Sequence, residues 1–346
     1  MKTVSVVVAC YNEEGNVRPL AEKIKEVFTK DLPRYQYQLL FIDNDSTDKT
    51  RPILEELCAE DPEHVCAIFN VHNFGSIRSS VYGLLQATGD CIVKMCADFQ
   101  DPPEMIVDFV REWEAGYKIV LAIKEGSQEN KLVYLVRKLY YSIISRITDI
   151  DHINNFVGYG LYDRDFIEIL RDLNDPMPYL RGVVAELGYK YKPLYYVQPK
   201  RRSGKSKFNF YRLYDYAMLG ITSYSKIPLR LATFAGVAIA AASFIIGIIY
   251  LILKLVNWYA FNWGMAPMLI GMFFLGAVQL LFIGIIGEYV LNINIRVLNR
   301  PLVVEEKRIN LPKENKHESA CNSRIPAGVA ADRDSAEKTH AELSER

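Results

Sequence analysis

Acidic and amide side chains gather in one short segment, CADFQDPPE (residues 96–104), directly after an apolar run. In an open α/β sheet, ligands bind beyond the carboxyl ends of the strands. The oxygens of Asp98, Gln100 and Asp101 suit Mg²⁺ or Mn²⁺, with ligand phosphates completing the coordination. An Asp101-Pro102 turn with Asp98 capping the next helix accounts for the segment equally well.

Two more polar segments follow earlier apolar runs. Tyr11, Asn12 and Glu13 come after the first run, and Asp43 and Asp45 come after the second. A carboxylate such as Asp43 can accept a hydrogen bond from the ring N–H of a uracil-type base. Acidic residues also stabilise an ordinary helix N-terminus, which is the alternative for the first segment. The second segment has more carboxylates than one helix cap needs.

A cationic loop near residue 200 combines positive charges, hydroxyls and a glycine. Cationic side chains and hydroxyls bind phosphate oxygens, and a glycine allows close approach. The alternative is contact with anionic lipid headgroups. The residues concerned are Arg201, Arg202, Ser203, Lys205 and Ser206.

The elements that must position these residues alternate between strand and helix patterns over about the first 125 residues. Near-continuous apolar strands separated by helices are typical of a parallel sheet covered on both faces. The sequence therefore predicts a doubly wound α/β domain. The predicted strands are 4–10, 37–42, 65–71, 91–97 and 118–123.

Two longer apolar runs, 231–253 and 267–287, carry no charge. Each is long enough to cross a hydrocarbon layer of about 30 Å as a helix. Basic residues flank the pair on both outer sides, which places both ends of the chain and the α/β domain in the cytoplasm. The sequence therefore predicts an integral protein of the cytoplasmic (inner) membrane with two spans.

The remaining segments define the domain boundaries. We expect an α/β domain at 1–227, a two-helix membrane hairpin at 228–290, a juxtamembrane segment at 291–304 and a disordered tail at 305–346. Amphipathic helices at about 131–150 and 207–227 would lie on the membrane surface. A core-facing surface helix is the alternative for the first of them.

Composition and motifs exclude several classes of protein. Lys+Arg and Asp+Glu both number 41, so no basic field favours nucleic acid. The six cysteines form no CxxC pairs, which favours reduced thiols over zinc sites or disulfides. The first strand leads into YNEEGN and not GxGxxG, which disfavours a dinucleotide oxidoreductase.

The motifs VVVACYNEEGN, FIDNDSTDKT, HNFG and ADFQDPPE, in this order, resemble family 2 glycosyltransferases with the GT-A fold. The likeness continues through RSGKSKF and both spans, and this layout looks like the polyprenyl-phosphate glycosyltransferase branch. That branch includes bactoprenol glucosyltransferases and dolichol-phosphate mannose synthases. The resemblance implies inverting transfer of a hexose from a nucleotide sugar, UDP-glucose or another UDP-hexose, to undecaprenyl or dolichyl phosphate at the cytoplasmic membrane face.

The same resemblance implies roles for individual residues. Asp98 and Gln100 would bind the metal ion, Mg²⁺ or Mn²⁺. A homo-oligomer, a tetramer by analogy, is also implied. Catalysis falls to Asp98, Asp101, Arg201 and Lys205, and donor binding to Tyr11, Asn12, Glu13, Asp43, Asp45, Arg202, Ser203 and Ser206.

Three positions depart from the family pattern. Cys96 stands in place of an Asp, Asn44 in place of another Asp, and residues 158–160, Gly-Tyr-Gly, in place of Asp-Phe-Arg. A phosphate acceptor, with a second pKa of about 6, is already anionic near neutral pH and needs no strong base. The alternatives are a GDP-mannose donor, a hydroxyl-directed polysaccharide glycosyltransferase and a non-catalytic membrane scaffold.

Overall fold

The computed structural model describes residues 1–126, 153, 155–199, 201–202, 210–256 and 265–312. The described residues up to Ile309 form one compact unit. The predicted surface helix at 131–150 lies outside the described residues, as do Ser203, Lys205 and Ser206.

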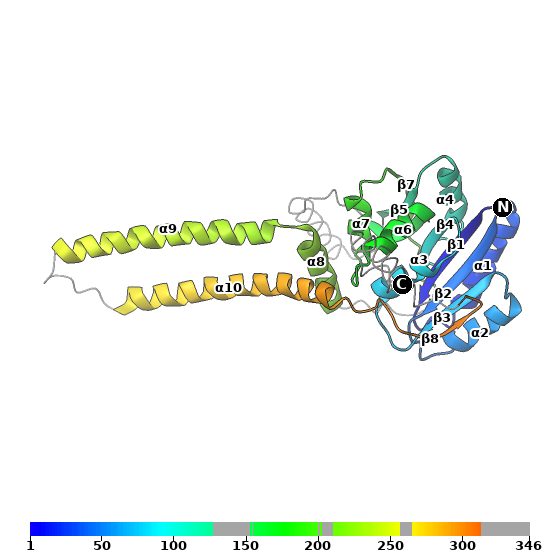
Figure 1. Cartoon of the computed structure of the whole chain (residues 1–346), viewed down its shortest axis with the longest axis horizontal. Coiled ribbons are helices and arrows are strands. Elements are labelled where there is room, and N and C mark those ends of the chain that lie inside the picture. Colours follow the sequence, from blue (N-terminus) through cyan, green and yellow to red (C-terminus); the bar gives the residue numbers. More distant parts are fainter. Residues whose placement is uncertain (127–152, 154, 200, 203–209, 257–264, 313–346) are drawn as a thin grey trace, which may run out of the picture. The chain divides into compact units, whose positions relative to one another are not determined.

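The described chain folds around a sheet with the strand order β7-β5-β6-β4-β1-β2-β3-β8 (Figure 1). The two central strands, β1 and β4, are buried along most of their length. The strands are β1 (Thr3–Cys10), β2 (Gln36–Asp43), β3 (Val65–Asn70), β4 (Cys91–Cys96), β5 (Ile119–Gly126), β6 (Phe156–Asp163), β7 (Tyr191–Val197) and β8 (Glu305–Ile309).

The predicted mainly parallel sheet is confirmed in its central part, where β1 pairs in parallel with β2 and β4, and β2 with β3. Strand β5 runs in the same direction as the other early strands, as predicted, but it does not pair with β4. Antiparallel β6 lies between β4 and β5, and β5 pairs in parallel with β7. The pattern did not predict β6 because its glycines interrupt the apolar run.

Helices cover both faces of the sheet. On one face α1 buries Val17, Leu20 and Ile24, whose spacing of three and four residues makes one apolar stripe. On the other face α3 approaches so closely that a Cβ on Gly83 would lie 2.6 Å from Val7 Cγ1. In Figure 1, α1 and α2 lie on one side of β1 and β2, and α3 and α6 on the other. The helices are α1 (Val17–Lys30), α2 (Thr50–Glu60), α3 (Ser76–Gln86), α4 (Met105–Glu114), α6 (Arg164–Leu173) and α7 (Leu180–Glu186).

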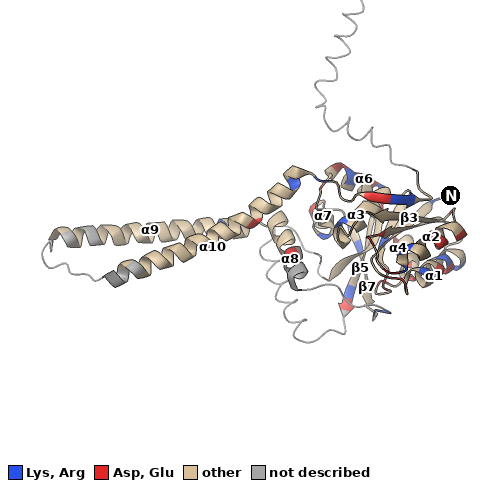
Figure 2. Ribbon diagram, turned by 90° about the horizontal axis from the view of Figure 1, so that it is seen from below, with Lys and Arg blue, Asp and Glu red and all other residues tan. Residues whose placement is uncertain are grey.

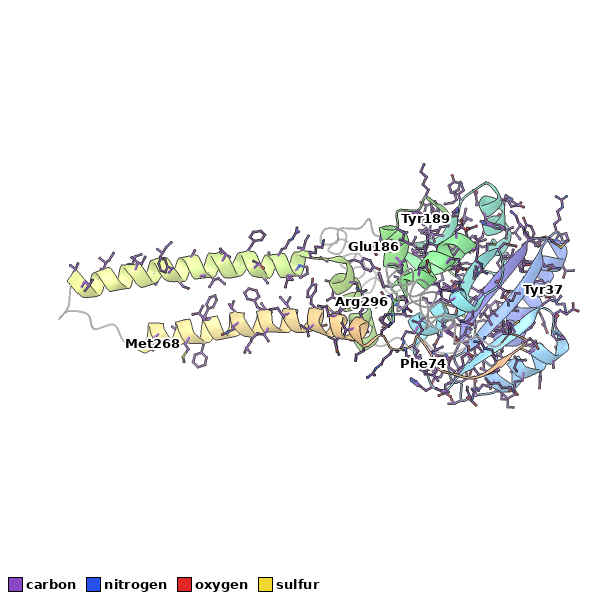
Figure 3. The ribbon with its side chains drawn as sticks, viewed as in Figure 1. Tyr37, Phe74, Glu186, Tyr189, Met268 and Arg296 are labelled. Carbon is purple, nitrogen blue, oxygen red and sulfur yellow. The ribbon has the colours of Figure 1, made fainter. Side chains whose placement is uncertain are left out.

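Three further helices follow, namely α8 (Phe210–Tyr224), α9 (Ile227–Val256) and α10 (Met265–Leu298). The segments 227–249 and 270–298 are long and apolar enough to cross a membrane, by length and composition. Figure 2 shows α9 and α10 almost free of charged residues, and their apolar side chains point outward in Figure 3. Phe234 and Phe273, for example, are more than 70% exposed. Such surfaces need an apolar environment.

Polar contacts join α10 to α8 and to the α/β domain. Tyr289 donates a hydrogen bond to the carbonyl of Ser225 at 2.7 Å, and Asn292 Nδ2 donates to Thr222 Oγ1 at 3.1 Å. Arg296, labelled in Figure 3, pairs with Asp175 at 3.2 Å. Helix α10 therefore extends well beyond the predicted end of the hairpin at residue 290 and occupies part of the predicted juxtamembrane segment.

The predicted disordered tail begins too early, because residues 305–309 form strand β8. This strand pairs antiparallel with β3 at the edge of the sheet. Its side chains make ion pairs with α2, Lys307 to Glu55 at 2.8 Å and Glu306 to Arg51 at 2.5 Å. A short, charged edge strand has no apolar run for a sequence pattern to detect.

Candidate active site

The loops after β1 and β2 are locked together by hydrogen bonds. Asn12 adopts a left-handed conformation with φ of 55°, and its backbone N–H donates to Ser46 Oγ at 2.8 Å. Its Oδ1 in turn accepts from the backbone N–H of Thr47 at 2.7 Å. Asp45 is also left-handed, with φ of 64°. Asn and Asp tolerate this conformation better than most residues, so the sequence YNEEGN…DNDST is well suited to these turns.

Asp43, the last residue of β2, has one carboxylate oxygen without a hydrogen-bond donor among the described residues. The residue is fully buried. Its Oδ2 accepts from the Ser46 backbone N–H at 3.2 Å and lies 3.1 Å from Arg51 Nε. Its Oδ1 is buried without a hydrogen-bond partner among the described residues. Burial raises the pKa of Asp43, although the Ser46 hydrogen bonds and the Arg51 charge oppose the rise. A buried carboxylate oxygen without a protein donor can accept a hydrogen bond from a ligand or a water molecule.

Asn44, which departs from the family pattern, connects three elements behind Asp43. Its Oδ1 accepts hydrogen bonds from Asn70 Nδ2 at 3.1 Å and Ser79 Oγ at 2.8 Å. The same oxygen accepts from the Phe74 backbone N–H at 3.0 Å, and Nδ2 donates to Asn73 Oδ1 at 2.8 Å. Asn44 therefore fixes the ends of β2 and β3 and the start of α3, and its role is structural.

We expect Asn44→Ala to lower the free energy of unfolding by about 3 kcal/mol, because three donors lose one buried acceptor. Gln36→Ala, which removes an exposed amide from the same strand, is the matched control and should change stability by less than about 0.5 kcal/mol. Urea denaturation measures both. Equal losses for the two variants would contradict the structural role of Asn44.

At the end of β4, Asp98 forms an ion pair with Arg201, with 2.7 Å between Oδ2 and Nη2. Its Oδ1 accepts from the backbone N–H of Gln100 at 3.1 Å. Phe99 between them has φ of 59°, an outlier for a bulky residue, and the Arg202 guanidinium lies 5.2 Å from the centre of its ring. The structure thus brings the start of the cationic loop onto the acidic segment.

Asp101 is buried below this pair and shapes the loop. Its Oδ2 accepts from the backbone N–H of Cys96 at 2.9 Å, and its Oδ1 lies 3.4 Å from the Tyr196 hydroxyl. Burial raises the pKa of Asp101, while the Cys96 hydrogen bond and the charge of Lys94 lower it. Because both oxygens have protein partners, these contacts are those of a positioning residue. A direct catalytic role for Asp101 stays a prediction.

A divalent cation could bind at the end of β4 only if a bound diphosphate supplied part of its coordination. Among the described residues there is no group of three His, Cys, Asp or Glu side chains that could hold a metal alone. Asp98 is buried with one oxygen toward Arg201, and Gln100 is half-buried beside it. Asp98 and Gln100 could supply two oxygens, and a diphosphate would supply most of the rest.

The strand order sets the distance between the two acidic positions. Asp43 ends β2 and Asp98 follows β4, and β1 lies between these strands. Two strand spacings correspond to about 10 Å. The carboxyl edge of the sheet therefore has the buried Asp43 acceptor at one position. The Asp98–Arg201 pair, which could bind phosphates through a cation or through the arginine, lies about one nucleoside length away.

Comparison with known proteins identifies the family of this chain. Residues 5–170 match the model of glycosyl transferase family 2. The SfII prophage-derived bactoprenol glucosyl transferase of Shigella flexneri is 32% identical over 88% of this chain and 97% of its own length. The uncharacterized glycosyltransferase YkcC of Bacillus subtilis is 33% identical over 90% of this chain and 95% of its own. The chain belongs to glycosyl transferase family 2.

A solved structure is also similar to this family 2 chain. It is glucosyl-3-phosphoglycerate synthase from Mycobacterium tuberculosis, in complex with Mn²⁺, UDP and glucosyl-3-phosphoglycerate. The sequence identity is 17%, and the match covers 64% of this chain and 78% of the other with a TM-score of 0.40.

The predicted site residues of this glycosyltransferase fall into two groups. Tyr11, Asn12 and Glu13 lie in the loop after β1, half-buried beside the β2 loop. Asp98, Gln100, Asp101 and Arg201 lie together at the end of β4, with Arg202 on Phe99. Sequence reasoning missed Arg51 and Tyr196, which contact Asp43 and Asp101. Arg51 directly follows the polar segment 43–50 and Tyr196 lies in strand β7, and neither local pattern reveals the contact.

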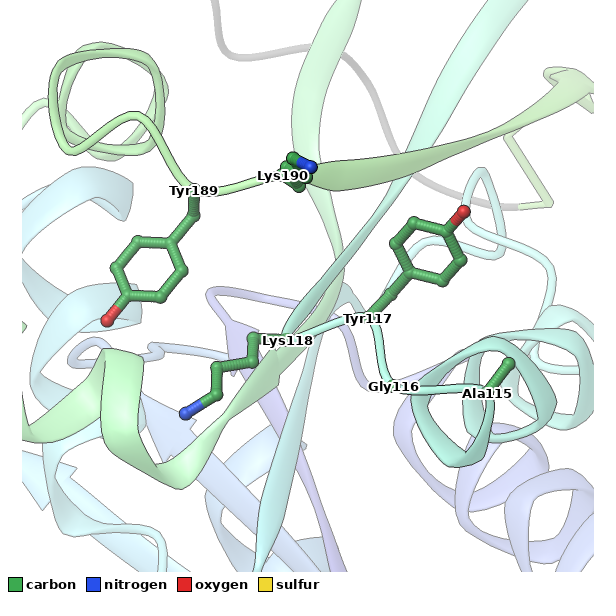
Figure 4. A pocket seen from close by; sticks show the side chains of 6 residues that line it. All are labelled: Ala115, Gly116, Tyr117, Lys118, Tyr189 and Lys190. Atoms are coloured by element: carbon green, nitrogen blue, oxygen red, sulfur yellow. The ribbon is translucent and has the colours of Figure 1, made fainter.

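Two hollows lie outside the row formed by Asp43 and Asp98, one far from it and one beside it. One, of about 350 Å³, is at the opposite edge of the sheet, where Lys118 and Lys190 precede β5 and β7 (Figure 4). The other, of about 720 Å³, is an open groove beside the site, lined by Phe99, Arg202 and residues of α1 among others. The first is at the amino ends of β5 and β7, away from the ligand edge of a parallel sheet.

Proposed function

We propose that this family 2 glycosyltransferase moves a hexose, with glucose as first choice, from a uridine diphosphate sugar to the phosphate of a polyprenyl lipid. The transfer inverts the anomeric centre and takes place at the cytoplasmic face of the membrane, into which α9 and α10 insert. The observation that carries the proposal is the unused, buried Oδ1 of Asp43, placed two strands from Asp98.

The donor half rests on hydrogen-bond chemistry. Uracil presents a ring N–H that needs an acceptor, and Asp43 Oδ1 is a buried acceptor without a protein donor among the described residues. A diphosphate extending from that base along the sheet edge reaches the Asp98 and Arg201 group. A divalent cation bound by Asp98, Gln100 and the phosphates would neutralise the charge on the leaving diphosphate.

The acceptor half rests on the relatives and on the two apolar helices. Relatives about 32% identical over most of the chain are named bactoprenol glucosyl transferases. Helices α9 and α10 are long and apolar enough to place the chain in a membrane, where a polyprenyl phosphate resides. At the end of β4, both oxygens of Asp101 have protein donors, which agrees with an acceptor that needs no carboxylate base.

The reaction needs positioning more than proton transfer. An acceptor phosphate oxygen attacks the anomeric carbon, the bond from that carbon to the nucleoside diphosphate oxygen breaks, and the diphosphate leaves with the electron pair. The attacking oxygen is already anionic near neutral pH, because the second pKa of a phosphomonoester is about 6. Asp43 holds the base, and Arg201, oriented by Asp98, faces the negative charge of the phosphates.

A panel of donors tests the donor assignment. The full-length protein in detergent micelles, with Mn²⁺, is incubated with UDP-glucose, UDP-galactose, GDP-mannose or dTDP-glucose, and its melting temperature and nucleotide release are measured. We expect the uridine sugars to stabilise the protein and to be turned over. Stabilisation by GDP-mannose alone would instead assign a mannosyl donor and contradict the uracil role of Asp43.

A further inference from the structure

Lys94 is a charged residue inside an otherwise apolar central strand. Its neighbours in β4, from Cys91 to Met95, are buried, while Lys94 itself is half-buried. Lysine is rarely found in such a strand, because burying an ammonium without a partner costs free energy. This position therefore calls for a function that an apolar residue would not provide.

The path of the side chain leads to the ligand edge of the sheet. Lys94 is opposite Gly160 of β6 in the antiparallel register. Its Nζ lies further along, beside Gly158, where an added Cβ would be only 3.0 Å from Nζ. Because β6 runs against β4, Gly158 is level with the carboxyl end of β4. The lysine side chain thus extends from the level of Gly160 to Gly158, toward the site.

The family pattern has Asp-Phe-Arg where this chain has Gly158, Tyr159 and Gly160. Gly158 has φ of 92°, a conformation that glycine adopts easily. A larger residue at position 158 would meet the lysine Nζ. The departure from the pattern removes a cationic side chain from β6 and makes room for the ammonium of Lys94.

Among the described residues, the Lys94 ammonium has no carboxylate within ion-pair distance, and its charge acts on Asp101 from farther away. None of the ion pairs among those residues includes Lys94, whereas Asp98 pairs with Arg201. Asp101 is engaged by Cys96 and Tyr196. Cys96, two residues along β4 and so on the same face as Lys94, is neutral where the family pattern has an Asp. A cation at the ligand edge is thus left for an anionic ligand.

The strand order indicates which ligand this is. The proposed donor extends from β2 across β1 to β4, and β6 lies on the far side of β4. In an inverting displacement the nucleophile approaches the anomeric carbon opposite the leaving diphosphate. The Lys94 side chain extends toward β6, which lies on the opposite side of β4 from the proposed donor site. The nucleophile would approach the anomeric carbon from this side.

We propose that the Lys94 ammonium binds the phosphate of the lipid acceptor and holds it in line with the anomeric carbon. This inference rests on the proposed function. It assigns the acceptor contact to Lys94 of β4, whose Nζ lies beside Gly158 of β6.

The test compares Lys94→Met, Lys94→Arg and the control Lys118→Met, which removes a lysine at the opposite edge of the sheet. We expect Lys94→Met to raise KM for the prenyl phosphate about 10- to 100-fold, as loss of a charged hydrogen bond does. KM for the nucleotide sugar should stay within about twofold. Lys94→Arg should recover most of the acceptor affinity, and Lys118→Met should behave like the wild type.

A binding measurement keeps this inference separate from the proposed function. Full-length protein without donor is titrated with farnesyl phosphate and with farnesol, followed by tryptophan fluorescence. The wild type should bind the phosphate more tightly than the alcohol, and Lys94→Met should lose that difference. If the wild type transfers no sugar, the proposed function fails, while the titration still decides on Lys94. An unchanged phosphate preference in Lys94→Met, or a rise in donor KM alone, overturns the inference.

Discussion

Asp98→Asn should reduce sugar transfer by about 100-fold or more, as loss of a preorganised electrostatic contact in an active site does. The substitution keeps the size of the side chain and the acceptor for the Gln100 backbone N–H. It removes the negative charge that pairs with Arg201 at 2.7 Å and that would hold the cation. Initial rates of glycolipid formation, measured at saturating donor and acceptor over a range of Mn²⁺ concentrations, give the effect.

Asp108→Asn is the matched control for this variant. Asp108 is an exposed carboxylate on α4 that pairs only with exposed Arg111 among the described residues. The Asp108→Asn variant should retain the wild-type rate. The melting temperatures of Asp98→Asn and Asp108→Asn should both lie within a few degrees of the wild-type value. A rate for Asp98→Asn within about twofold of wild type would remove Asp98 from the reaction.

Asp43→Asn should weaken donor binding about 10- to 100-fold without destabilising the fold. The amide can turn a hydrogen-bond donor toward the base, where the carboxylate offers only acceptors. Arg51 keeps an ion pair with Glu306 at 2.5 Å in the variant. The dissociation constant for UDP, measured by isothermal titration calorimetry, and the urea midpoint report the two effects.

The stability part of this prediction follows from the pKa of Asp43, which burial raises. For a carboxyl whose pKa is raised by folding, the associated stability is present at low pH and is lost as pH rises through the folded pKa. The charged form therefore costs stability at neutral pH, and a neutral asparagine avoids that cost. On acidification, the UDP affinity of the wild type should begin to fall at a higher pH than it would if Asp43 had the pKa of an ordinary aspartate.

Thr47→Ala, which alters an exposed side chain in the same loop, is the control for Asp43→Asn. It should change the UDP affinity by less than about threefold. If Asp43→Asn unfolds the protein at neutral pH or leaves the UDP affinity unchanged, the buried Oδ1 is not the base acceptor.

The early strands were predictable because their apolar runs are long and each ends in polar residues. Cys91 to Ala97 and Val4 to Cys10 were assigned to within a residue or two. Strand β6 was not predictable from its pattern, since Gly158 and Gly160 look like breaks in a strand. Strand β8 has charges on both faces and is formed by its pairing with β3, which no local signal encodes.

The sequence predicted which loops form the site, but it did not predict the contacts between their side chains. The positions of Asp43 and Asp98 follow from where strands end in a parallel sheet. The ion pair of Asp98 with Arg201 joins residues about a hundred positions apart, and only the fold reveals it. The sequence could mark Lys94 as a charge within an apolar strand, but not the direction in which its side chain runs.

Transfer of a hexose to a lipid phosphate is tested by the product that the purified enzyme forms. Full-length protein is incubated with Mn²⁺, radiolabelled UDP-glucose and undecaprenyl phosphate, and the lipid extract is analysed. We expect one labelled, mild-acid-labile glycolipid with the β-configuration, inverted from the α-linked donor. Label that appears only as free glucose, or in a lipid whose sugar is joined to a hydroxyl, would contradict it.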